Sequence, residues 1–389
     1  MDSPFARAGS PARAKVFPPY RTGMEKITVR ALNRALLARQ LLLARERRGV
    51  LDAVEHLVGL QSQVPGAPYT GLWARLDGFD PEDVSRLMTD RALVRMSTLR
   101  GTVHLHSAAD ALALRPLCQQ VNDRGPFGRS VYRRALAGVD PAALATAARR
   151  LLTERPLTNT ELGAALLADF PGYTPSDLAW AVRDGLPLVQ VPPRGLWGRG
   201  GRTTSTTVEH WLGRSLDPEP SPDRLVLRYL AAFGPAGVRD AQAWSGLTRL
   251  AEVFERLRPR LRGFADAATG RELFDLPDAP RPDQDTPAPV RLLPVYDNVI
   301  LGHDDRSRIA DPDALRALTA GNGYQSAFLV DGRIRGSWAL RTTGAGAVLA
   351  LRPFAALAEA DRAALEATAG ELLALHAPAA GPALVVFDR

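Results

Sequence analysis

Apolar residues recur at helical spacing through the first third of the chain. Leu32, Leu36 and Leu43 keep a helical period between residues 28 and 48, with arginines between them. Asp80-Pro81 has the pattern of a helix start, because Asp is a good N-terminal cap and Pro fits the first helical position. The expected elements are helices over about 28–48, 51–60, 68–76 and 81–90 and strands over 93–96 and 102–106.

Two later segments repeat one order of elements. Each predicts helices followed by two strands around a glycine-containing turn, and Thr158 with Glu161 forms a capping pattern. The expected elements are helices from 157 and over 175–185, 224–233, 238–245 and 248–258, and strands over 186–191, around Trp197, and over 263–266 and 271–274. Three helices and a hairpin is the winged-helix order, and residues 28–106 can be interpreted in the same way.

The last third changes character. Residues 276–290 are rich in Pro and Asp and predict a linker. Short apolar runs between glycine turns over 291–352 predict a small β-barrel, which a helix over 359–376 and a strand over 383–387 close. The predicted fold is α+β, mainly α, with three tandem winged helices and a C-terminal barrel. The predicted domains are a tail over 1–23, winged helices over 24–150, 151–222 and 223–275, the linker over 276–290 and the barrel over 291–389.

Composition narrows the class of protein. The 389 residues are 46% hydrophobic and carry a net charge of +7, which favours a polyanionic partner. One cysteine, Cys118, excludes a disulfide framework and a multi-cysteine metal site. The chain has no apolar run long enough to span a membrane, and its basic start lacks the apolar core of a secretory signal, so we expect a cytoplasmic protein.

A pair of glutamines is the strongest local candidate for chemistry. Gln61 and Gln63 follow an apolar helix and precede Pro65, where the backbone is expected to extend. Alternate side chains of extended backbone share a side, so the two carboxamides would project together and could hold one water. The alternative is an ordinary polar helix terminus.

Two further segments allow more than one interpretation. His104 and His106 share one face of a predicted strand, as metal ligands, core imidazoles or DNA contacts would. His303, Asp304 and Asp305 fit a metal-dependent nuclease, a polar loop with Arg–Asp pairs, or a loop whose Arg306 and Arg308 contact phosphates. No metal or cofactor is assigned.

Several motifs together resemble one family. They are Leu32-Asn33-Arg34, Ala38-Arg39-Gln40, Gly59-Leu60-Gln61-Ser62-Gln63, Arg100-Gly101-Thr102-Val103-His104, Tyr296-Asp297-Asn298 and His303-Asp304-Asp305-Arg306. Over residues 24–389 the chain resembles the bacterial winged-helix DNA glycosylases typified by AlkZ and YcaQ. With Gln63 at its last position, the motif resembles that of the AlkZ branch, which is Gln-aliphatic-Gln, although Ser62 replaces the aliphatic residue.

The resemblance implies a C-shaped cleft around duplex DNA, excision of N7-alkylated purines, unhooking of interstrand crosslinks, and a possible part in antibiotic self-resistance. We expect Gln61 and Gln63, with Asn33 as a weaker candidate, to act on the water, and we expect a monomer. The residues expected to contact DNA are Arg100, Thr102, His104, Arg194, Arg199, Arg202, Arg306 and Arg308. The segment from Arg194 to Arg202 is interpreted as a basic wing that enters a groove, or as an ordinary hairpin.

Lysine is nearly absent, and this bears on mechanism. Only Lys15 and Lys26 could form a Schiff base with a sugar, and Lys15 lies in the predicted tail. The chain is therefore predicted to be a monofunctional glycosylase that leaves an abasic site uncleaved. The alternative function is a non-catalytic winged-helix transcriptional regulator, since fold alone does not give activity.

Overall fold

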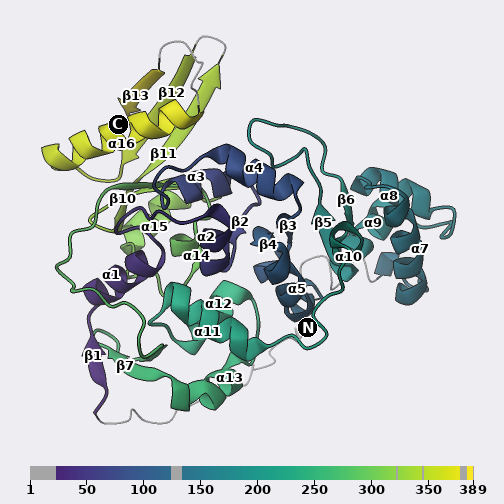
Figure 1. Cartoon of the computed structure of the whole chain (residues 1–389), viewed down its shortest axis with the longest axis horizontal. Helices are drawn as coiled ribbons and strands as arrows, with labels where there is room; N and C mark the ends of the chain where they lie inside the picture. Colours follow the sequence, from purple (N-terminus) through teal and green to yellow (C-terminus); the bar gives the residue numbers. More distant parts are fainter. Residues whose placement is uncertain (1–22, 124–133, 321–322, 344–345, 377–382, 389) are drawn as a thin grey trace, which may run out of the picture.

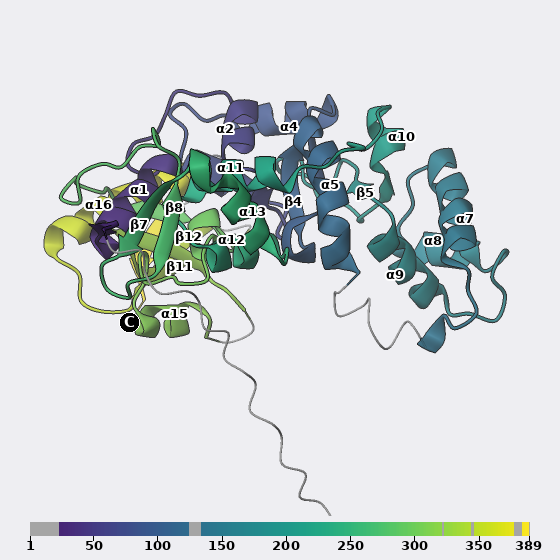
Figure 2. The ribbon, with the colours of Figure 1, turned by 90° about the horizontal axis from the view of Figure 1, so that it is seen from below.

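The computed structural model describes residues 23–123, 134–320, 323–343, 346–376 and 383–388. The predicted tail over 1–23 therefore lies almost wholly outside the described residues. In Figures 1 and 2 helices α7, α8 and α9 lie together at one end of the molecule, and α1 and α16 lie towards the other. None of the described helices is long and apolar enough to cross a membrane.

The N-terminal part is helical, with the helices shorter than expected. Its elements are α1 Val29–Arg39, α2 Val50–His56, α3 Ala67–Trp73, α4 Pro81–Thr89 and α5 Ala108–Asn122. The helices expected over 28–48 and 51–60 end early because the backbone turns left-handed, at Leu41 after α1 and at Val58 and Gly59 after α2. The start of α4 is as predicted, since the Asp80 side chain accepts a hydrogen bond from the Glu82 N–H.

One five-stranded antiparallel sheet joins the first two predicted winged helices. Its strands, in the order β2–β4–β3–β5–β6, are Leu60–Gln61, Val103–Ser107, Leu93–Ser97, Leu188–Gln190 and Ser205–Thr207. The β3–β4 hairpin confirms the strands expected there. The junction is the pairing of β3 with β5, in which Arg95 lies opposite Gln190 and Met96 opposite Val189.

The second winged-helix segment forms its own small core. Its helices are α7 Pro141–Glu154, α8 Asn159–Leu166, α9 Pro175–Gly185 and α10 Val208–Leu212. Helices α7, α8 and α9 pack on one another, so α7 runs across the expected boundary at residue 150. Thr158 and Glu161 form the predicted capping box at the start of α8.

The strand expected around Trp197 is wrong. Residues 191–204 connect β5 to β6, and the Trp197 ring packs against Tyr69 and His376, with centroids 4.9 Å away in each case. The Tyr69 hydroxyl also donates to the Gly195 carbonyl oxygen at 2.7 Å. The loop therefore makes its contacts with side chains and not with a neighbouring strand, and these contacts hold it against α3.

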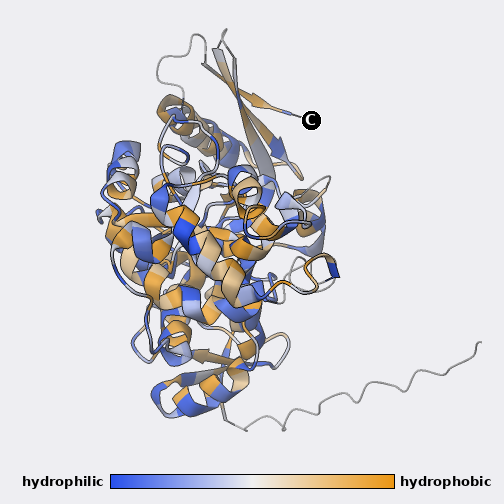
Figure 3. Ribbon diagram, turned by 90° about the vertical axis from the view of Figure 1, so that its right-hand side faces the viewer, coloured by the Kyte–Doolittle hydropathy of each residue, from blue (hydrophilic) through white to orange (hydrophobic). Residues whose placement is uncertain are grey.

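The third winged-helix segment matches its predicted elements and lies in the central body. They are α11 Pro222–Phe233, α12 Val238–Ser245, α13 Leu250–Leu257, β7 Arg262–Asp266 and β8 Glu272–Asp275. An unpredicted strand, β1 Glu25–Ile27, adds parallel to β7. In Figure 3 hydrophobic and hydrophilic residues alternate along the helices, which is typical of helices with one buried face.

The predicted C-terminal barrel is wrong, because the sheet is open. Its strands, in the order β13–β12–β11–β10–β9, are Ala383–Phe387, Gly346–Pro353, Arg333–Thr343, Ser326–Val330 and Arg291–Leu293. Helix α16 (Glu359–His376) packs on β9, β12 and β13 and buries Leu365, Ala369 and Leu372. A helix therefore provides the apolar cover that a closed barrel would have supplied from its own strands.

The expected linker runs along helix α1. Arg34 Nε donates to the Thr286 carbonyl oxygen at 2.6 Å and Arg30 Nε to that of Gln284 at 2.9 Å. Two short helices, α14 Asn298–Leu301 and α15 Pro312–Leu318, follow β9 before the chain enters β10. The segment thus ties α1 to the C-terminal part of the chain.

Candidate active site

Gln61 ends the short strand β2 and Gln63 follows two residues later, and the start of this strand is tightly constrained. After α2 the backbone reverses at Gly59, whose φ is +90°, and a Cβ there would lie 2.3 Å from His106 Nδ1. The Asn298 side-chain amide donates to the carbonyl oxygens of Leu57 and Gly59, at 3.3 and 3.1 Å. Glycine is therefore required at 59, and α14 positions the entry to β2.

Ser62 points into the protein interior. It is fully buried, and its hydroxyl and carbonyl oxygens accept hydrogen bonds from Arg95 at 2.8 and 2.9 Å. Its N–H donates to the Val103 carbonyl oxygen, which continues the β2–β4 pairing by one residue. The polar residue at this position therefore has a polar partner, Arg95, where the family pattern has an aliphatic residue.

An arginine fixes the orientation of the Gln61 carboxamide. Arg100 Nη2 donates to Gln61 Oε1 at 2.8 Å and lies 3.4 Å from His104 Nε2, and its other terminal nitrogen donates to the Trp244 carbonyl oxygen. Because arginine only donates, the oxygen of Gln61 must face Arg100 and its NH₂ group must face the other way. Arg100, expected to contact DNA, instead positions Gln61, which is 8% exposed.

Gln63 has different surroundings from Gln61. It is exposed, and its Oε1 accepts a hydrogen bond from the Val103 N–H at 3.3 Å. It lines a cavity of about 480 Å³, of which Gln61 is not a lining residue. The side-chain oxygen of each glutamine accepts one hydrogen bond from the protein. Each glutamine can therefore offer a ligand its NH₂ group and the second lone pair of its oxygen.

The two histidines of β4 share one face, as predicted. Their rings stack with centroids 5.5 Å apart, and both are buried. His104 Nδ1 lies 2.9 Å from the Thr102 carbonyl oxygen, while His106 Nε2 lies 2.8 Å from the Thr98 hydroxyl. Burial holds the pKa of His104 well below its usual range and lowers the pKa of His106 to about 4, so both are neutral core imidazoles at neutral pH.

Because these histidines are buried and neutral, we expect the stability of the fold to fall in acid. An unfolded imidazole has a pKa of about 6.5, so between that pH and about 4 the unfolded chain binds more protons at position 106 and acid destabilises the fold. We expect His106 to account for a loss of about 1.4 kcal/mol per pH unit in the lower part of this range. Urea unfolding midpoints from pH 7.5 to 4.5 measure the loss. The His106→Gln variant should show a shallower pH dependence, and an unchanged dependence contradicts the assignment.

Asn33 and Arg308 are buried and make hydrogen bonds within the protein. The Asn33 amide donates to the carbonyl oxygens of Arg308 and Gly332, each at 2.8 Å, and is buried. Arg308 is also buried and donates to the Pro235 carbonyl oxygen at 3.0 Å, while Arg306 is half-buried against the Tyr324 hydroxyl at 2.6 Å. The structure does not bring Asn33 together with the glutamines, and it gives Arg308 no surface that DNA could contact.

The remaining predicted DNA contacts lie on or near the surface. Arg199 and Arg202 are exposed on the 191–204 loop, and half-buried Arg194 donates to the Gly201 carbonyl oxygen at 3.1 Å. The Thr102 hydroxyl donates to the Leu99 carbonyl oxygen at 3.2 Å. Arg202 also donates to the Thr158 hydroxyl at 3.2 Å and lies 3.8 Å from a Glu161 carboxylate oxygen, so Arg194 and Arg202 already have partners within the protein.

The His303 segment does not form a metal site. His303 Nε2 lies 3.0 Å from the Phe233 carbonyl oxygen, Asp305 pairs with Arg271 at 2.8 Å, and Asp304 is exposed. The described part of the chain contains no group of three His, Cys, Asp or Glu side chains that could hold a metal ion. The Arg–Asp interpretation of this loop is the one that the contacts support.

Sequence reasoning missed three arginines beside Gln63. Arg95, Arg115 and Arg183 line the same cavity, with Arg194 and Arg202. Arg95 interrupts the apolar strand Leu93-Val94-Arg95-Met96, and Arg115 lies within an apolar helix. These two arginines could have been found from the sequence, because each is a charged residue at a position that the hydrophobic periodicity predicts to be buried.

Comparison with known proteins identifies the family. The family model for AlkZ-like DNA glycosylases matches residues 54–375. A relative from Streptomyces sahachiroi, named interstrand DNA cross-link repair glycosylase, is 27% identical over 325 residues, which are 78% of this chain and 85% of the relative. The solved structure of Streptomyces sahachiroi DNA glycosylase AlkZ matches with a TM-score of 0.72 and 21% identity, over 93% of this chain and all of that one.

The two kinds of match carry different weight. The solved structure shows a shared fold, of mainly helical α and β content with an open C-terminal sheet. The family model covers well over half of the chain and confirms the family that the sequence motifs predicted. The chain belongs to the AlkZ-like DNA glycosylase family.

Proposed function

We propose that this chain removes N7-alkylated purines from duplex DNA and unhooks interstrand cross-links, leaving an abasic site. The observation that carries the proposal is the glutamine pair at the end of β2, whose NH₂ groups point away from their arginine and backbone partners. The name of the Streptomyces relative, which refers to interstrand cross-link repair, supports the substrate class. No observation favours the transcriptional regulator over a glycosylase.

The proposed reaction needs little catalytic assistance from the protein. An N7-alkylated purine is already cationic, so its bond to C1′ is weak and needs no strong general acid. When the bond breaks, its electron pair moves to N9 and neutralises the ring, a water oxygen bonds to C1′, and the released proton passes to solvent. Gln61 and Gln63 would orient that water through their remaining lone pairs and NH₂ groups. Orientation without proton transfer belongs at the low end of the roughly 10²–10⁴-fold range for such groups.

The distribution of lysine supports a monofunctional enzyme. Lys26 is exposed on β1, which pairs with β7 in a different sheet from β2. Lys15 lies outside the described residues. A covalent Schiff base at C1′ needs an amine within reach, and among the described residues no lysine is near the glutamines. The abasic product is therefore expected to remain uncleaved.

A duplex with a single N7-methylguanine and an end-labelled strand tests the proposal. We expect an excess of the protein to create abasic sites, which appear as strand breaks only after alkali, and to separate the strands of an N7-guanine interstrand cross-link. The undamaged duplex is the control. The absence of alkali-sensitive sites contradicts the glycosylase proposal, and breaks that appear without alkali contradict its monofunctional character.

A further inference from the structure

The cavity beside Gln63 is strongly cationic. It is lined by residues of β3, β5, α5, α8 and α9 and of the loop before β6. Five arginines contribute to its wall, none of its described lining residues is acidic, and of the five only Arg202 lies at ion-pair distance from a carboxylate among the described residues, that of Glu161 at 3.8 Å. They are Arg95, Arg115, Arg183, Arg194 and Arg202.

Two of these arginines are buried and have only neutral hydrogen-bond acceptors. Arg95 donates to both oxygens of Ser62 and, at 3.4 Å, to the Arg194 carbonyl oxygen. Arg115 donates to Gln119 Oε1 and to the Leu186 carbonyl oxygen, at 2.7 and 3.2 Å. Burial, and to a lesser extent Arg194, lower the pKa of Arg95 to about 10, and burial also lowers the pKa of Arg115.

Three of the four other buried arginines among the described residues have a carboxylate partner, and the fourth, Arg308, donates to the Pro235 carbonyl oxygen. Arg39 pairs with Asp275, Arg75 with Asp297 and Arg34 with Asp331. Within the described residues no carboxylate lies at ion-pair distance from Arg95 or Arg115, and the acidic groups around Arg115 act on it from farther away. A buried charge without a partner is costly. An anion in the cavity would remove that cost.

The rest of the wall favours a phosphate over a base. The described lining residues include Ser97, Thr158, Asn159 and Ser205, which can donate hydrogen bonds, and no aromatic ring. Pockets that receive a displaced base hold it between aromatic or apolar side chains. Phosphate contacts instead come from arginines, hydroxyl groups and amides.

Resting on the glycosylase function proposed above, we propose that this cavity binds a backbone phosphate of the damaged strand, next to the nucleotide whose base is removed. Two residues connect the cavity to the glutamine motif. Gln63 forms part of its wall, and Arg95 holds Ser62 between the two glutamines. A phosphate bound there keeps the lesion sugar beside the glutamines without a deep base pocket.

Neutral linkages in the DNA test the proposal on the unaltered protein. Duplexes with one methylphosphonate at successive positions around an N7-methylguanine remove one phosphate charge at a time. We expect the affinity of the full chain to fall about 10-fold at a linkage next to the lesion, because charge-assisted hydrogen bonds are lost. If no linkage next to the lesion has this effect, the proposal is overturned.

Arginine variants show whether the cavity causes that effect. Arg183 and Arg194 are half-buried, so the double variant Arg183→Gln/Arg194→Gln should fold. We expect it to bind the all-phosphate duplex about 10-fold more weakly, to lower the salt slope of binding by about 0.9, and to be indifferent to the sensitive methylphosphonate. The double variant Arg214→Gln/Arg352→Gln, an equal charge change at two exposed residues outside the cavity wall, should retain the full response.

The outcomes separate this site from the function on which it rests. A double variant that loses the same factor as the wild type at the sensitive linkage overturns the phosphate site. If the wild type still excises N7-methylguanine from that duplex, the glycosylase proposal stands without the site. Sensitivity to removal of the base opposite the lesion, with none to any linkage, would identify a base pocket and also overturn the site.

Discussion

Replacing both Gln61 and Gln63 with alanine lowers the single-turnover rate of N7-methylguanine excision by about 100-fold, while duplex affinity changes less than about twofold. The expected factor is the low end of the range for positioned groups, because a carboxamide orients the water without accepting its proton. The rate is followed by alkali cleavage with protein in excess, so that product release does not contribute. Binding is measured on the same duplex.

Matched variants distinguish a loss of positioning from a loss of folding. Gln61→Glu keeps an acceptor for Arg100 and removes the NH₂ group, so it isolates donation by Gln61. Gln325→Ala removes a glutamine that donates to the Ala317 carbonyl oxygen, away from the site, and should leave the rate unchanged. An unchanged rate in the double alanine variant would refute the role of the pair.

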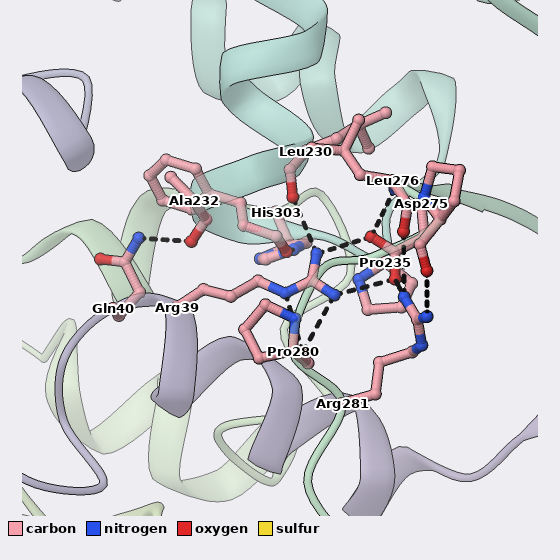
Figure 4. Close-up of polar contacts among 12 residues, drawn as sticks. Arg39, Gln40, Leu230, Ala232, Pro235, Asp275, Leu276, Pro280, Arg281 and His303 are labelled. Atoms are coloured by element: carbon pink, nitrogen blue, oxygen red, sulfur yellow. Dashed lines mark hydrogen bonds and ion pairs between the residues drawn. The ribbon is translucent and has the colours of Figure 1, made fainter. Parts of the chain in front are cut away.

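Replacing Arg39 with methionine destabilises the fold by about 3 kcal/mol, because the buried Asp275 carboxylate loses one of its two arginine partners and keeps only Arg281. Both side chains are fully buried, and two hydrogen bonds of 2.6 and 2.8 Å join them. Figure 4 shows Arg39 also reaching the carbonyl oxygens of Leu230 and Pro280. One guanidinium thus ties α1 to α11, to β8 and to the segment after β8.

Urea unfolding of Arg39→Met measures this loss. The double variant Arg39→Met/Asp275→Leu should recover part of the stability, because no fully buried charge is left without its partner; Arg281 loses Asp275 but still donates to the Leu276 and Pro277 carbonyl oxygens. The exposed pair of Arg47 and Asp77 supplies the control: Arg47→Met should change the free energy of unfolding by less than about 0.5 kcal/mol. A single variant at position 39 that unfolds like wild type contradicts the structural role.

Family motifs that suggested chemistry are largely structural here. Asp297 is the buried partner of Arg75, Asn298 holds the turn before β2, and Gln40 donates to the Ala232 carbonyl oxygen. Arg39 and Asn33 act in the same way on α1. These polar residues hold together segments that are distant in sequence. These motifs outside the glutamine pair therefore have a structural role.

What the sequence by itself determined is local. The helix over 359–376, the capping box at Thr158 and Glu161, and the β3–β4 and β7–β8 hairpins follow from side-chain periodicity and from hydrogen bonds within a few residues.

Only the tertiary structure decided which distant groups meet. The pairing of β3 with β5, the cover of α16 on an open sheet, the contact of Arg100 with Gln61, and the gathering of five arginines beside Gln63 all join residues remote in sequence. Their free energy depends on desolvation and on competing partners across the whole fold. A periodic pattern records that a residue is buried, but the identity of its partner depends on how the separate segments pack.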